Sequence, residues 1–209
     1  YEIPLRLVGS EMCIRDSMGN VTLALALQCF VIYQVLLFVF TRLNPIKFVK
    51  KFLPVMGFAF STATSNATIP MSIDTLNKKM GVSKQISSFT IPLGATINMD
   101  GTSIMQGVAV IFIAEAYGIH LTPANLATVV VTATLASIGT AGIPSVGLVT
   151  LAMVLNSVGL PTEGIALIMG IDRILDMLRT AVNITGDAVC TTIVSHQEKA
   201  LNREVFNRD

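Results

Sequence analysis

Five polar side chains recur at helical spacing in an otherwise hydrophobic stretch near the C-terminus. They are Asp172, Asp176, Arg179, Asn183 and Asp187, at intervals of four, three, four and four residues. At about 100° per residue, these intervals place all five on one helical face that is less than about 90° wide. A guanidinium binds a carboxylate through two hydrogen bonds, and carboxylates bind ammonium groups or hard cations. The stripe therefore predicts a binding site for charged ligands on one face of a long helix.

The balance of charge on this face favours ligand binding over a purely structural role. A structural ion pair of Arg179 with Asp172 or Asp176 is the alternative, but one arginine cannot neutralise three carboxylates. A carboxylate ligand would suit Arg179, and an ammonium group would suit Asp176, one turn earlier. Asp187 has no basic neighbour in the sequence and suits a hard cation such as sodium.

A second polar motif, Gly94-Ala-Thr-Ile-Asn-Met-Asp-Gly-Thr102, interrupts the hydrophobic stretch from Ile86 to Tyr117. Its two glycines would allow an unwound turn with inward-facing carbonyl groups. Asn98 and Asp100 add amide and carboxylate oxygens, which hard cations prefer as ligands. An Asn-x-Asp-Gly sequence is more often a surface turn, but this one lies in a stretch with almost no charge. We therefore expect it to contribute to the same cation-binding region.

The composition indicates that these charges lie within a membrane protein. The chain has 209 residues, of which 52% are hydrophobic and only 13% charged, whereas soluble domains carry about 25% charged residues. A net charge of +1 argues against a nucleic-acid partner. The three cysteines have no regular spacing, which argues against a disulfide scaffold.

Hydrophobic segments and basic groups predict how the chain meets the membrane. Residues 17–41 carry no charged side chain. Because about 20 apolar residues are enough to cross a hydrocarbon core, this stretch predicts a transmembrane helix. Lysine and arginine next to membrane segments favour the cytoplasm. The basic groups lie at 42–51, 78–84 and 199–208. We expect all three on the cytoplasmic side.

This topology makes two segments, 52–77 and 122–158, leave and return on the same side of the membrane. Each is too short for two crossings, with arms of about 12 residues, or roughly half a bilayer. Each also has a polar centre with a proline, Ser61 to Pro70 in the first and Ser137 to Ser145 in the second. A kink in one long helix is the alternative. We predict two re-entrant hairpins, broken across these centres, whose tips meet near the midplane.

The predicted fold class is an all-α membrane protein with about three transmembrane helices and two re-entrant helical hairpins in an inverted repeat. The predicted divisions are a lead-in at 1–17, a transmembrane helix at 18–42, a core at 43–200 and a cytoplasmic tail at 196–209. Within the core we expect a hairpin at 48–80, a broken helix at 85–118, a hairpin at 122–158 and a helix at 161–195.

Four motifs in this sequence resemble the dicarboxylate/amino acid:cation symporters, the family of glutamate transporter homologues. They are Ser65-Asn-Ala-Thr-Ile-Pro70, Pro92 to Thr102, Gly139-Thr-Ala-Gly-Ile-Pro144 and Asp172 to Asp187. The resemblance covers about residues 18–200 and matches the C-terminal half of that fold, so we expect a truncated fragment whose residues 1–17 do not belong to the family. It implies a sodium-coupled symporter of L-glutamate or L-aspartate, not an enzyme. It also implies a plasma (inner) membrane location, a cytoplasmic C-terminus, contact with membrane lipid and a homotrimer for the full-length parent.

The resemblance also implies roles for individual residues. It assigns the substrate to Ser65, Asp176, Arg179, Thr180 and Asn183, with Asp176 on the amino group, Arg179 on the side-chain carboxylate, and Thr180 and Asn183 on the main carboxylate. It makes the outer hairpin a gate. The gate residues are Gly139, Ala141, Gly142 and Ile143.

Three sodium sites are implied in the same way. The first uses carbonyl groups of Gly94, Asn98 and Asn183 with the carboxylate of Asp187. The second uses carbonyl groups of Thr96, Ser137, Ile138 and Thr140. The third uses Asn98 and Asp100 with hydroxyl groups from a helix outside this sequence.

Several alternatives stay open at the level of sequence. A symporter of four-carbon dicarboxylates or of neutral amino acids is possible within the same family, although the pair of Asp176 and Arg179 favours acidic amino acids. A membrane-embedded aspartyl hydrolase would need Asp100 and Asp176 to share one water. A third alternative is a fragment without function of its own.

Overall fold

The computed structural model describes residues 18–138, 142 and 144–208. These residues are almost entirely helical, and the extended pairing found among them is one isolated bridge between Val82 and Leu201. Two of the described helices, Met18–Thr41 and Lys84–Ala116, are long and apolar enough to cross a membrane. The predicted all-α class is therefore confirmed.

The first helix, Met18–Thr41, includes a π-helical turn at Gln28–Ile32 and continues as α2 (Tyr33–Thr41). Large apolar side chains are exposed on its outer surface. Its buried hydrophobic side chains recur every fourth residue and pack on the core. They are Val21, Leu25, Cys29, Tyr33 and Leu37.

The first hairpin consists of α3 (Pro45–Thr62) and α4 (Ser65–Met80), which pack against each other. The expected break across 61–70 is wrong, because only Ala63 and Thr64 leave the helices and Pro70 lies inside α4. A left-handed residue, Ala63 with φ 50°, followed by an extended Thr64 is enough to end one helix and begin the next. The arms consequently have 18 and 16 residues, longer than the expected 12 or so.

The predicted broken helix is α5 (Lys84–Ile97) followed by α6 (Asp100–Ala116). The break falls on Asn98 and Met99, whose ψ angles are 82° and 46°. The glycines at 94 and 101, expected to unwind the chain, instead lie inside helices. These glycines are therefore not needed for an unusual backbone conformation.

The second hairpin consists of α7 (Pro123–Ser137) and α8 (Val146–Ser157). At the start of α7, the Thr122 hydroxyl accepts a hydrogen bond from the Asn125 amide, and Pro123 occupies the first helical position. A 3-10 turn (Thr162–Gly164) leads into α9 (Ile165–Gln197), and a short α10 (Arg203–Asn207) follows.

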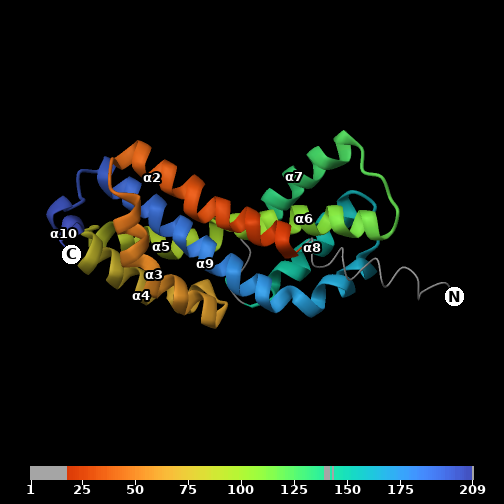
Figure 1. The fold of residues 1–209 in the computed structure, drawn as a ribbon, viewed down its shortest axis with the longest axis horizontal. Coiled ribbons are helices and arrows are strands. Elements are labelled where there is room, and N and C mark those ends of the chain that lie inside the picture. The colour runs from red at the N-terminus through yellow and green to blue at the C-terminus, as the bar shows by residue number, and fades with distance from the viewer. Residues whose placement is uncertain (1–17, 139–141, 143, 209) are drawn as a thin grey trace.

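Helix α9 is the centre of the structure. It packs against α2, α3, α4, α5, α6 and α8. Figure 1 shows the two helix pairs at opposite ends of the molecule, with α3 and α4 at one end, α7 and α8 at the other, and α9 running between them. This arrangement brings the turns of both pairs to the middle of α9.

The three basic segments share one end of the molecule. The Lys51 ammonium donates hydrogen bonds to the carbonyl oxygens of Lys79 at 2.9 Å, Phe206 at 2.7 Å and Arg208 at 2.6 Å, and it lies 5.6 Å from the centre of the Phe206 ring. Arg203 donates to the carbonyl oxygen of Thr41 at 2.8 Å. These contacts fix α10 against the ends of α3, α4 and the first helix.

Replacing Phe206 with alanine should release the C-terminal segment. Its side chain is fully buried, so its loss removes the apolar contact that holds α10 in place. We expect amide hydrogen exchange over residues 201–208 to accelerate by about tenfold or more, measured by mass spectrometry. The matched control is Phe89→Ala, at a position 69% exposed. Equal exchange in the two variants would show that Phe206 does not anchor this segment.

Candidate functional site

The turns of the two helix pairs touch each other beside α9. The Thr64 hydroxyl donates a hydrogen bond to the carbonyl oxygen of Gly142 at 2.6 Å. Gly142 is so close to the first turn that a Cβ atom there would lie 3.1 Å from Cβ of Ser65 and 3.2 Å from the Asn66 amide oxygen. The other predicted gate residues, Gly139, Ala141 and Ile143, lie outside the described residues, as does Thr140.

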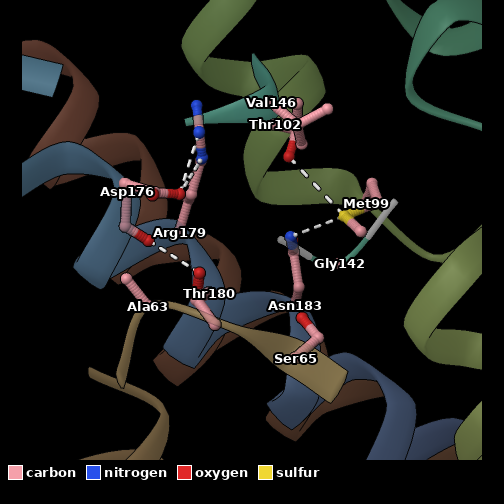
Figure 2. Close-up of a pocket in the computed structure, with 10 residues that line it drawn as sticks. All are labelled: Ala63, Ser65, Met99, Thr102, Gly142, Val146, Asp176, Arg179, Thr180 and Asn183. Atoms are coloured by element: carbon pink, nitrogen blue, oxygen red, sulfur yellow. Dashed lines mark hydrogen bonds and ion pairs between the residues drawn. The ribbon is translucent and has the colours of Figure 1, made fainter. Parts of the chain in front are cut away.

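All five predicted substrate-binding residues line one cavity where these turns meet α9. The lining residues are Ala63, Ser65, Met99, Thr102, Gly142, Val146, Asp176, Arg179, Thr180 and Asn183. Figure 2 shows Asp176, Arg179 and Thr180 on one side of this cavity and Met99 and Gly142 facing them. The cavity volume is about 10 Å³, roughly the space of one water molecule. A larger ligand can therefore bind only if the lining side chains move.

Arg179 is held between two carboxylates. Its Nε and Nη2 atoms donate to Oδ1 of Asp176 at 3.0 Å and 2.8 Å, and its Nη1 atom lies 3.7 Å from Oδ1 of Asp172. The second oxygen of Asp176 accepts a hydrogen bond from the Ser145 amide at 2.8 Å. All three charged side chains are 2% exposed. The ion pair that the sequence offered as the alternative is therefore present.

Thr180 and Asn183 are also engaged within the protein. The Thr180 hydroxyl donates to the Asp176 carbonyl oxygen at 2.8 Å. The Asn183 amide oxygen accepts from the Gly101 amide at 2.7 Å, and its amide nitrogen lies 3.3 Å from the Met99 sulfur. These bonds connect α9 to the break between α5 and α6.

The residues of the first predicted sodium site lie together. The Asn98 side-chain amide donates to Oδ1 of Asp187 at 2.9 Å and to the Asn183 carbonyl oxygen at 3.4 Å. Gly94 lies directly against Asp187, since a Cβ atom at Gly94 would be 2.5 Å from the same carboxylate oxygen. Asp187 thus has a neutral partner and is 3% exposed.

Asp100, predicted for the third sodium site, faces the first helix. Its Oδ2 atom accepts hydrogen bonds from the Tyr33 hydroxyl at 2.9 Å and from the Gln28 side-chain amide at 3.2 Å. Sequence reasoning missed both donors. The signal for them was the presence of polar side chains inside an otherwise apolar helix.

The second predicted sodium site is distributed over two helix ends. Thr96 is near the end of α5, while Ser137 is the last residue of α7 and Ile138 follows it. The Thr96 hydroxyl donates to Leu93 of its own helix at 2.8 Å, and the Ser137 hydroxyl donates to Thr134 of its own helix at 2.8 Å. Both bonds involve side-chain hydroxyl groups, so the role of the backbone carbonyl groups of these residues as sodium ligands stays a prediction.

Three glycines allow close approach of side chains from α9. Besides Gly94, a Cβ atom at Gly101 would lie 2.9 Å from the Asn183 amide oxygen, and one at Gly147 would collide with the Arg179 guanidinium. The absence of a side chain at these positions, rather than a special backbone conformation, makes room for the polar stripe.

Comparison with known proteins shows similarity to one family of transporters. The profile of the sodium:dicarboxylate symporter family matches residues 14–197, which includes the last four residues of the predicted lead-in. An excitatory amino acid transporter of Caenorhabditis elegans is 43% identical over 183 residues, covering 88% of this chain and 36% of that protein. Human excitatory amino acid transporter 1 is 42% identical over 190 residues, covering 91% and 34%. The chain spans about a third of the length of the curated relatives that it matches.

Replacing Gly94 with alanine should destabilise the protein through its contact with Asp187. The added methyl group overlaps a buried carboxylate, and overpacking of this kind costs about 1–3 kcal/mol. Gly57→Ala is the control, because a Cβ atom there meets nothing within 4 Å and glycine-to-alanine changes in open helix positions gain about 0.5–1 kcal/mol. Thermal unfolding in detergent micelles should rank the variants Gly57→Ala, wild type and Gly94→Ala in falling order of stability. A Gly94→Ala protein as stable as the wild type would contradict the close contact.

Proposed function

Because the chain belongs to the sodium:dicarboxylate symporter family, we propose that it forms the substrate-binding part of a membrane protein that carries an acidic amino acid together with sodium ions. The observation that carries this proposal is the buried pair of Asp176 and Arg179, which lines a cavity between two touching helix turns. The family consists of symporters, not enzymes. A hydrolase is also disfavoured because Asp100 and Asp176 have separate hydrogen-bond partners.

The membrane arrangement that we propose has three spanning elements and two re-entrant hairpins. The spanning elements are residues 18–42, the broken helix α5–α6 and α9, and the hairpins are α3–α4 and α7–α8. The basic end with α10 and the tail from 196 to 209 faces the cytoplasm, because lysine and arginine near membrane segments favour that side. The full-length protein would lie in the plasma membrane as a homotrimer.

An acidic amino acid carries one group that can bind each member of the buried ion pair. Its ammonium group would bind Asp176, and one of its carboxylates would bind Arg179 through the Nε and Nη2 atoms that now donate to Oδ1 of Asp176. Leaving one charge of such a pair without a partner costs about 3–5 kcal/mol. A neutral amino acid, which lacks the side-chain carboxylate, and a dicarboxylate without an amino group would each leave one partner unsatisfied. Ser65, Thr180 and Asn183 complete the proposed site.

Sodium ions would compensate the carboxylates that have only neutral partners. Asp187 is bonded to the Asn98 amide, and Asp100 to Tyr33 and Gln28. Uncompensated charge at such depth costs several kcal/mol. We assign one sodium to Asp187 with carbonyl groups of Gly94, Asn98 and Asn183. A second sodium would bind carbonyl groups of Thr96, Ser137, Ile138 and Thr140, and a third would bind Asn98 and Asp100.

The second hairpin would act as the gate of this site. Gly142 is hydrogen-bonded to Thr64 of the first hairpin, so parting of these turns would open the cavity. The proposed gate residues are Gly139, Ala141, Gly142 and Ile143.

Replacing Arg179 with alanine should abolish uptake of acidic amino acids. The change removes the proposed carboxylate ligand, and loss of one member of a buried charge pair corresponds to a loss of about 100-fold or more. Uptake of labelled L-aspartate and L-glutamate is measured in cells that express the full-length protein carrying this sequence. Each measurement is made in sodium and repeated with sodium replaced by choline. Arg173→Ala, an exposed arginine on the same helix, is the control. Unchanged sodium-dependent uptake by Arg179→Ala would overturn the proposal.

Replacing Asp176 with asparagine should reduce the preference for amino acids over plain dicarboxylates. A hydrogen bond to a charged group contributes about 1.5–3 kcal/mol, so the affinity for L-aspartate should fall by about 10- to 100-fold. Succinate has no ammonium group and should lose less. Competition of unlabelled L-aspartate or succinate against labelled L-aspartate measures the two affinities. The control is Asp74→Asn, which changes an exposed carboxylate in α4. An equal loss for both ligands would argue against a role for Asp176 in binding the ammonium group.

A further inference from the structure

The first helix contributes two hydrogen-bond donors to a single carboxylate oxygen of Asp100. The Tyr33 hydroxyl lies 2.9 Å and the Gln28 amide nitrogen 3.2 Å from Oδ2. Tyr33 is only 4% exposed, although it belongs to a helix whose outer surface is largely apolar and exposed. Both donors act on Oδ2, and among the described residues no hydrogen bond to Oδ1 is found, so Oδ1 is the oxygen that we assign to another ligand.

A π-helical turn makes this convergence possible. In a regular α-helix, five residues turn the chain by about 500°, so positions 28 and 33 would point about 140° apart. Here the Tyr33 amide bonds to the Gln28 carbonyl oxygen, five residues back, and the wider turn brings both side chains to the same face. The helix therefore departs from regular geometry at the place where two donors are needed.

The Tyr33 hydroxyl also lies beside the elements that hold Asp187. A Cβ atom at Gly186 of α9 would be 2.6 Å from the Tyr33 oxygen and 2.7 Å from the Asn98 amide nitrogen. The same Asn98 nitrogen donates to Asp187. The Tyr33 side chain thus lies where the first helix contacts α9 and the break between α5 and α6.

We propose that Tyr33, assisted by Gln28, is a positioning residue for a sodium ion at Asp100. Both donors are neutral, so they fix the orientation of the carboxylate without cancelling the charge that attracts a cation. Asp176 differs, because the Arg179 guanidinium neutralises it. This inference rests on the proposed function, since it requires that Asp100 binds sodium. Loss of a hydrogen bond that orients a metal-binding carboxylate lowers metal affinity by about 10- to 100-fold.

The test measures sodium binding without transport or amino acid. The melting temperature of the full-length protein in micelles is followed as sodium chloride replaces choline chloride at constant ionic strength. We expect Tyr33→Phe to raise the sodium concentration at half-maximal stabilisation by about tenfold or more. Gln28→Leu removes the second donor and should act in the same direction. Thr192→Val is the control, because it removes a buried hydroxyl that donates only within α9.

A double-mutant cycle separates positioning from general stability. Asp100→Asn should remove part of the sodium response, and adding Tyr33→Phe to Asp100→Asn should change the remaining response no further. An equal shift by Tyr33→Phe in both backgrounds, or a lower melting temperature in choline with an unchanged sodium dependence, would overturn the inference and leave the proposed function standing. A wild-type protein that responds equally to sodium and choline would refute sodium binding itself.

Discussion

Arg179 contacts two carboxylates, Asp176 and Asp172, in the buried middle of the structure. A guanidinium buried in the middle of a helix bundle must always have an anionic partner, because removing one member of a buried pair costs about 3–5 kcal/mol. Asp176 provides that partner through two hydrogen bonds, and Asp172 lies 3.7 Å away. Gly147 of α8 lacks the side chain that would collide with the guanidinium, and the Met105 sulfur lies 3.3 Å from it. Helices α6, α8 and α9 thus pack around one guanidinium group.

The two halves of the polar stripe are compensated in different ways. Towards the N-terminal end of α9, positive and negative side chains pair directly. Towards its C-terminal end, Asp187 has the Asn98 amide as its partner, and the nearby Asp100 has Tyr33 and Gln28. Asn98 also reaches the Asn183 carbonyl oxygen, and Asn183 lines the cavity beside Arg179, so short contacts connect the two halves. This connection provides a physical route by which sodium and an acidic amino acid could bind together.

The sequence was sufficient to predict the polar stripe on α9, because periodicity alone places Asp172, Asp176 and Arg179 on one face and charge alone requires that face to be buried. It also located the break within the first helix pair, since Ala63 and Thr64 fall within the expected first turn. The prediction overestimated the extent of the break because it assigned Pro70 to the turn, whereas Pro70 is the sixth residue of α4, a helix that packs against α3, α5 and α9. A proline inside a helix removes a backbone hydrogen bond, but most helical stability in proteins comes from packing of this kind. The close approach at Gly94 and the convergence of Tyr33 on Asp100 could not be predicted, because both depend on contacts between helices that are far apart in sequence.

In the mechanism that we propose, charge compensation couples binding of the amino acid to binding of sodium. Calorimetric titration of L-aspartate into the full-length protein, at a series of sodium concentrations balanced with choline, measures this coupling. We expect the affinity for L-aspartate to rise steeply with sodium, and L-aspartate to strengthen sodium binding by the same factor, as reciprocal linkage requires. An L-aspartate affinity that is the same in sodium and in choline would show that the two ligands bind independently.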